Sequence, residues 1–165
     1  MSTRVSSVEQ LESPLDDVFR VLTAASWVEH KAAALHDGGR VVDRQATAEG
    51  GVLLVVSRTL PRGAPGFVER FLPADGRLVQ SDRWEGGAPG EARSGTWSVA
   101  LPGAPATLGG TMRLDPAGTG TRYAVDGQVE VRVPLIGGKA ERYVAEMVGK
   151  LARKEAALLR RELEA

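Results

Sequence analysis

The fold is decided by residues 121–164, which read TRYAVDGQVEVRV-PLIGG-KAERYVAEMVGKLARKEAALLRRELE. The first part alternates, and its apolar face carries Tyr123, Val125, Val129, Val131 and Val133. A period of two with one apolar face indicates a half-buried antiparallel strand. Pro134 ends this strand, and Gly137–Gly138 marks a turn. We predict a helix from about Lys139 to about Glu164 after that turn.

Six further segments upstream show the same period of two. They are Arg4–Leu11, Arg40–Thr47, Val52–Leu60, Arg77–Trp84, Gly95–Leu101 and Thr107–Leu114. Two short helices lie between the first and the second of these strands. Pro14 begins one helix, with Ser13 as its N-cap, and Ser26 caps the other. The order predicts an α+β fold in one domain, residues 1–165, with about seven antiparallel strands and a long C-terminal helix.

The composition excludes several classes of function. The chain has 21 Lys and Arg against 21 Asp and Glu, so it lacks the net basic charge typical of a nucleic-acid binder. There is no cysteine, which excludes disulfides and thiolate chemistry. No segment approaches the ~20 apolar residues of a membrane span, and the first residues do not read as a signal peptide. We expect a cytoplasmic protein with no nucleic-acid partner and no stable membrane insertion.

Three motifs resemble those of a known superfamily. The stretch Val18–Thr23 resembles the first-helix signature of START-like proteins, also called SRPBCC or helix-grip proteins. The stretch Val131–Lys139, followed by Glu141, resembles, together with Trp27–Ala32, an uncharacterised family of that superfamily, classed as a domain of unknown function. The resemblance implies a strongly bent sheet around the C-terminal helix. It also implies a cavity for small apolar molecules such as lipids or polyketides, and it implies no catalytic residue.

The residues themselves also favour an internal pocket. Large aromatic side chains are few, and Gly95, Gly110 and Gly127 fall at inward strand positions, where they leave room or let the sheet bend. The final helix carries a broad apolar arc. We predict a ligand-binding wall formed by Trp84, Trp97, Met112, Tyr123, Val144, Met147, Val148 and Leu151. The sequence leaves open the alternative that these side chains fill a solid core.

Three charged residues fall among these inward positions. Asp82 shares a strand face with Trp84, so it points inward if Trp84 does. Glu155 lies in the middle of the apolar arc of the helix, and Arg58 is its candidate partner because a buried charge must be paired. We treat Arg58, Asp82 and Glu155 as candidate polar anchors for a ligand. Two alternatives stay open: Asp82 is exposed to solvent, and the Arg58–Glu155 pair is purely structural.

No motif points to catalytic residues, a cofactor or a metal. His30 and His36 lack the i, i+4 spacing of helical metal ligands, and we expect both to be exposed. We therefore predict a protein that binds a small apolar ligand between the C-terminal helix and the sheet. An enzyme of the cyclase or hydratase type is one alternative, since it needs only a general acid or base in the cavity. A regulatory or co-chaperone-like module that binds a protein partner is another.

The irregular segment Pro61–Pro73 has two predicted roles. Its Pro and Gly residues break regular structure, and we expect one helical turn through Phe67, Val68 and Phe71. We predict that the segment is a mobile lid over the cavity. It is also the one candidate for an exposed apolar contact with a protein partner.

Overall fold

A computed structural model describes residues 2–60 and 63–165. Along the chain the elements are β1 (Thr3–Leu11), α1 (Leu15–Leu22), α2 (Ala25–Leu35), β2 (Arg40–Ala46), β3 (Val52–Thr59), α3 (Gly66–Glu69), β4 (Arg77–Trp84), β5 (Arg93–Ala100), β6 (Ala106–Ala117), β7 (Gly120–Val131) and α4 (Gly137–Glu164). The predicted order is confirmed. The expected helical turn is α3, and residues 61–62 of the predicted lid lie outside the described residues.

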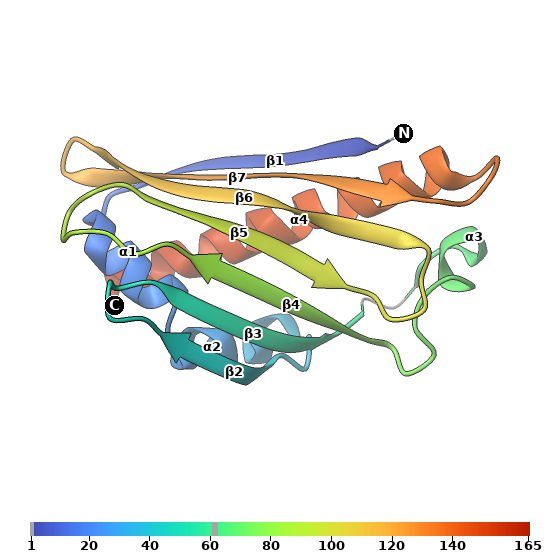
Figure 1. The fold of residues 1–165 in the computed structure, drawn as a ribbon, viewed down its shortest axis with the longest axis horizontal. Coiled ribbons are helices and arrows are strands. Elements are labelled where there is room, and N and C mark those ends of the chain that lie inside the picture. The colour runs from blue at the N-terminus through green and yellow to red at the C-terminus, as the bar shows by residue number, and fades with distance from the viewer. Residues whose placement is uncertain (1, 61–62) are drawn as a thin grey trace.

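The strands form one antiparallel sheet in the order β1-β7-β6-β5-β4-β3-β2. The first strand of the chain is therefore an edge strand and pairs with the last one. Figure 1 shows α4 crossing one face of the sheet behind β7, β6 and β5 and ending beside α1. At the opposite edge α2 packs on the same face, where Val28 joins Leu54 and Val56 of β3 in a small buried cluster. We call the sheet face that carries these helices the inner face.

The strand register fixes which side chains point to the inner face. On β3 and β4, Leu54 is paired with Asp82 and Val52 with Trp84. Paired residues of antiparallel strands point to the same side. Because Trp84 is only 3% exposed and Leu54 is buried, the whole alternate set of β4 faces inward. Asp82 therefore points inward, as its shared face with Trp84 predicted.

The inward glycines make room for neighbouring groups of the protein. A β-carbon on Gly127 would lie 2.5 Å from the Trp97 indole, and one on Gly95 would lie 3.2 Å from the Trp84 ring. A β-carbon on Gly110 would collide with the backbone of β7 at Asp126. The indole N–H of Trp97 donates to the Asp126 carbonyl at 3.1 Å, so the ring lies across the glycines. These glycines thus accommodate aromatic rings and close strands, and their count alone says nothing about a ligand.

Both predicted N-caps are wrong. Helix α1 begins at Leu15 behind Pro14, and α2 begins at Ala25, so Ser26 lies inside the helix. Neither helix has a side-chain cap. Ser13 is held in another role, because its carbonyl oxygen accepts a hydrogen bond from the hydroxyl of Thr121 at 2.8 Å. Tertiary contacts therefore override the local capping preference here.

The junction between β7 and α4 is tighter than the sequence suggested. The helix begins at Gly137, so the predicted Gly-Gly turn is its first turn. A β-carbon on Gly137 would lie 2.5 Å from the Val131 carbonyl oxygen. The Glu141 carboxylate, in a residue only 1% exposed, accepts hydrogen bonds from the Val131 N–H at 3.0 Å and the Thr3 hydroxyl at 3.1 Å. This clamp fixes the start of α4 to β7 and β1.

Candidate functional site

The residues predicted to form the ligand wall fall into two groups. The first group belongs to the main hydrophobic core or packs against it, and contains Trp84, Trp97, Met112, Tyr123, Val144 and Val148. The second group is Met147 and Leu151, which are partly exposed and are not among the side chains that pack on this core. The structure thus brings the predicted wall to the inner face, but part of it is core and part of it is accessible.

The two accessible residues lie between two contacts of α4. Toward the start of the helix, Tyr143 packs edge-on against Phe67 of α3, with ring centroids 6.5 Å apart. Further along, Glu155 reaches β3. Helical periodicity places Met147 and Leu151 between these contacts, on the side of α4 that turns away from β1 and β7. An apolar stretch of helix is therefore left accessible where α4 faces α3 and β3.

A buried arginine forms the polar centre of the inner face. The Arg58 side chain, 9% exposed, donates to one oxygen of Asp37 from Nε at 3.1 Å and from Nη2 at 2.8 Å. Its Nη2 also donates to Glu155 at 3.0 Å, and its Nη1 donates to Gln80 at 3.0 Å. The predicted pairing of Arg58 with Glu155 is confirmed. The flanking carboxylates raise the pKa of Arg58 against the lowering effect of its burial, which is the largest single influence.

Two members of this cluster were missed by the sequence analysis. Asp37 follows α2 and belongs to no periodic pattern, yet it is the closest partner of Arg58 and also accepts the backbone N–H of Gly39 at 2.8 Å. The Lys31 ammonium on α2 lies 3.5 Å from Glu155. Both residues lie in segments far from β3 and α4 in the sequence. No local sequence pattern therefore points to their contact with Arg58 and Glu155. We call Lys31, Asp37, Arg58, Gln80, Asp82 and Glu155 the polar cluster.

Asp82 is the carboxylate of the polar cluster that has no cation in direct contact among the described residues. One of its oxygens accepts the Gln80 amide N–H at 3.1 Å. Burial raises the pKa of Asp82, and the negative charge of Glu155 adds to the rise, whereas the Gln80 hydrogen bond and the charges of Lys31 and Arg58 oppose it. Asp82 is only partly buried, so part of the residue surface remains accessible. A protonated carboxyl in this position can donate a hydrogen bond into the space in front of it.

Tyr123 faces the same interior from β7. Burial raises the pKa of its hydroxyl well above the ordinary value, and the charges of Asp82 and Glu155 raise it further. Within residues 2–60 and 63–165, its hydroxyl is neither hydrogen-bonded nor completely enclosed. Tyr123 is therefore a neutral phenol whose O–H is available as a donor.

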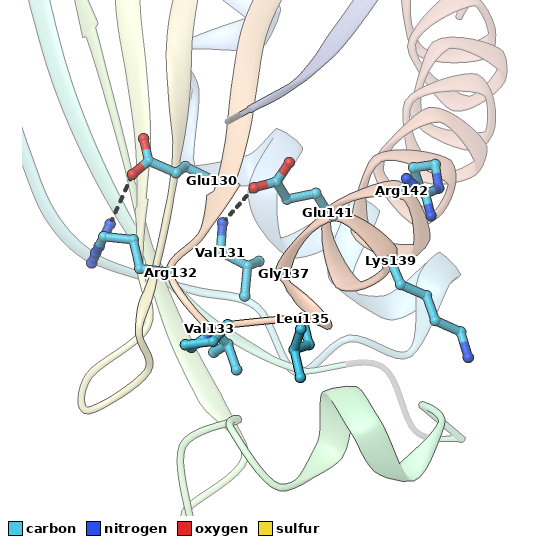
Figure 2. A pocket seen from close by; sticks show the side chains of 11 residues that line it. Glu130, Val131, Arg132, Val133, Leu135, Gly137, Lys139, Glu141 and Arg142 are labelled. Carbon is cyan, nitrogen blue, oxygen red and sulfur yellow. Dashed lines mark hydrogen bonds and ion pairs between the residues drawn. The ribbon is translucent and has the colours of Figure 1, made fainter.

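A separate open pocket of about 640 Å³ lies at the junction of β7 and α4. Figure 2 shows its lining, which comes from the end of β7, the turn and the first two turns of α4. None of the predicted wall residues lines it. Met112 lines a smaller pocket of about 310 Å³ between the ends of β4, β5 and β6. Neither pocket coincides with the accessible stretch of α4 at Met147 and Leu151.

Two further site types were searched for in the described residues. His, Cys, Asp and Glu side chains nowhere gather there in a group of three that could hold a metal ion. His30 and His36 are both exposed, as expected, and His30 pairs with Glu162 of α4 at 2.7 Å. None of the helices over the same residues is long and apolar enough to cross a bilayer.

The class of protein follows from the architecture. A seven-stranded antiparallel sheet that packs on one long C-terminal helix, with two short helices after the first strand, is the helix-grip fold of START-like proteins. Residues 7–163 match the family described as "Protein of unknown function (DUF2505)". The chain belongs to this family, and no protein of curated function matches it by sequence.

Several solved structures share the fold at low sequence identity. Protein Ms6760 from Mycobacterium smegmatis superposes with a TM-score of 0.61 at 13% identity, covering 98% of this chain and 90% of that one. The di-domain ARO/CYC BexL from the BE-7585A biosynthetic pathway gives a TM-score of 0.65 at 15% identity, covering 99% of this chain and 50% of that one. Norcoclaurine synthase of Thalictrum, in complex with a transition-state analogue, gives 0.55 at 12% identity and covers 96% and 94%. At these identities the likeness concerns the fold.

Proposed function

We propose that this protein binds a small, mostly apolar molecule that carries one neutral polar group. The ligand lies on the inner face against α4, with its apolar part on Met147 and Leu151 and its polar group toward Asp82 and Tyr123. The observation that carries the proposal is the partly exposed apolar stretch of α4, which lies next to the polar cluster around buried Arg58 and is not among the side chains packed on the core.

The accessible stretch is unusual for an inward helix face. Fully burying a Leu or Met side chain contributes roughly 1.5–3 kcal/mol, so leaving such residues partly exposed between two packed contacts forgoes part of this gain. Here α4 is held on both sides of the stretch, by Tyr143 against Phe67 and by Glu155 against Arg58. The helix therefore cannot settle onto the stretch without losing one of these contacts. A ligand can cover it instead.

The polar cluster selects the chemistry of the ligand. The cations Arg58 and Lys31 are already matched by Asp37 and Glu155, so no positive charge is left to bind an anionic head group. Burial raises the pKa of Asp82 and so favours its neutral, protonated form, which adds no cation to the cluster. A fatty-acid carboxylate would therefore find no unmatched cation in the cluster, whereas a ketone, ester or hydroxyl oxygen can accept a hydrogen bond from protonated Asp82 or from Tyr123.

Fluorescence binding with a neutral apolar probe tests the proposal. N-phenyl-1-naphthylamine should bind the wild type and gain fluorescence, and Leu151→Gln should weaken binding about tenfold because it replaces apolar contact by an amide. Val8→Gln, which changes a 52% exposed residue on the outer face of β1, is the matched control and should bind as the wild type does. Equal affinity for all three proteins would contradict the proposed site.

Native mass spectrometry of protein purified from its own host addresses the natural ligand. We expect a co-purified neutral molecule with at least one oxygen acceptor. A co-purified long-chain carboxylate would contradict the argument from the cluster charges.

An enzyme of the cyclase or hydratase type is the second candidate. The observation that favours it is Asp82, a carboxyl with a raised pKa and with no cation in contact among residues 2–60 and 63–165, which suits a general acid. The test compares wild type and Asp82→Asn incubated with small-molecule extract of the host. A compound consumed by the wild type alone would support the enzyme, whereas identical extracts would support binding.

The protein-partner module has less support, because Val68 is 6% exposed and Phe67 packs against α4.

A further inference from the structure

The turn before α4 exposes an apolar tip. Leu135 is fully exposed, at 104% of its reference surface, and Pro134 before it is exposed as well. Figure 2 shows Leu135 on the turn that borders the open pocket. A single exposed leucine is ordinary on a protein surface. This one is different because its backbone is also strained.

Leu135 has a φ of 71°, a left-handed conformation that bulky side chains rarely adopt. The N–H of Ile136 donates to the Pro134 carbonyl at 2.9 Å, which makes Leu135 the centre of a γ-turn of the rare, strained kind. Glycine would adopt this conformation without a steric penalty. The chain thus holds a leucine where glycine would be more stable, and the side chain gains no burial in return. Strain of this kind points to a role outside the folded protein's own stability.

Cations surround the tip. Arg132, Lys139 and Arg142 are exposed at the rim of the pocket. Arg132 pairs with Glu130 at 3.8 Å. The Lys139 ammonium lies 4.3 Å from the centroid of the Phe67 ring, and neither Lys139 nor Arg142 forms an ion pair with any described residue. The carboxylate of Glu141 lies in the interior and is engaged by β1 and β7. Because the whole chain has a formal net charge of +0, this is a local positive field and not a general property of the surface.

We propose that this tip docks reversibly on an anionic lipid surface, with Leu135 inserted among the acyl chains and Lys139 and Arg142 on the head groups. One exposed apolar side chain beside two cations that have no acidic partner among the described residues fits a charged membrane surface. It does not fit a protein partner well, because a specific protein interface buries about 800 Å² per partner and the apolar tip consists of two residues. The anchor is too small for permanent attachment, so binding should be weak and reversible.

Co-sedimentation with vesicles tests the proposal on the full chain. The wild type should pellet with vesicles of phosphatidylcholine mixed with phosphatidylglycerol, far less with pure phosphatidylcholine, and less as salt is raised. Leu135→Gly should weaken binding about tenfold or more. Lys139→Gln and Arg142→Gln should each weaken it about fivefold on the anionic vesicles and leave the weak binding to neutral vesicles unchanged.

Leu135→Gly also separates docking from folding. Because glycine tolerates the positive φ, this variant should melt at or above the wild-type temperature, so its loss of binding cannot come from unfolding. Val42→Gly, at a 59% exposed residue on the far edge strand β2, is the control and should keep vesicle binding. Failure of the wild type to pellet with anionic vesicles, or equal pelleting of Leu135→Gly, would overturn the proposal. So would wild-type protein that ignores vesicles but retains a host protein which Leu135→Gly does not, since the tip would then be a protein contact.

Discussion

Replacement of Arg58 by methionine is the sharpest test of the polar cluster. Methionine replaces the unbranched stem of the side chain but removes the guanidinium group and all four of its hydrogen bonds. Lys31 still compensates Glu155, so the carboxylate left alone is Asp37, whose side chain is 13% exposed. Removing one partner of a buried ion pair costs about 3–5 kcal/mol. Asp37 keeps the hydrogen bond from Gly39, so we expect the lower end, about 3 kcal/mol.

Glu155→Ala should cost less than Arg58→Met. The Glu155 side chain is 26% exposed and makes one hydrogen bond to Arg58, while Arg58 keeps both bonds to Asp37 in the variant. A hydrogen bond to a charged group contributes about 1.5–3 kcal/mol, and partial solvent access places Glu155→Ala near the low end of that range. The contacts of the cluster thus predict that Arg58→Met lowers the free energy of unfolding more than Glu155→Ala does.

Urea unfolding followed by tryptophan fluorescence at neutral pH measures both variants. The control is Arg113→Met, which removes an arginine paired with Asp115 at 2.9 Å but 53% exposed, and should change the free energy of unfolding by less than about 1 kcal/mol. If Arg58→Met unfolds within about 1 kcal/mol of the wild type, or if Glu155→Ala costs more than Arg58→Met, Arg58 is not the centre of the cluster and the reasoning is wrong.

Three further predictions concern stability. Because the pKa of Asp82 is raised in the folded state, the folded protein holds this proton to higher pH than the unfolded chain, and stability is lost as pH rises through the folded pKa. Asp82→Asn should therefore unfold at higher urea concentration than the wild type at pH 7, with a difference that shrinks toward about pH 4; a constant difference would contradict the shift. Glu141→Ala should cost about 1–3 kcal/mol because the last N–H of β7 loses its acceptor, whereas exposed Glu146→Ala should change the unfolding free energy by less than about 0.5 kcal/mol. Gly137→Ala should lower the melting temperature through its 2.5 Å approach to the β7 backbone, while Gly149→Ala, whose β-carbon meets nothing closer than 3.6 Å, should raise stability by about 0.5–1 kcal/mol.

Short-range pattern was enough to predict the elements and the family. The alternation in residues 121–133 and the apolar arc of the last helix each follow from local periodicity, which depends only on which face is buried. The inward direction of Asp82 followed from Trp84 in the same way, because residues two apart on a strand share a face. Glu155 stood out as a charge within an apolar arc, and its partner Arg58 was correctly chosen since it too has apolar neighbours.

The tertiary structure alone decided what these residues do together. Asp37 and Lys31 approach Arg58 and Glu155 from α2 and the turn after it, and no local pattern encodes an approach across the sheet. The inward glycines looked like space in the sequence, but the Trp97 ring occupies it, because a large side chain on one strand can reach over its neighbours. Leu135 is exposed and has a left-handed backbone in the turn between β7 and α4, and no local sequence pattern predicted either property. Periodicity determines which face of an element is buried, whereas contacts between distant elements determine which atoms meet, and the candidate site is made of such contacts.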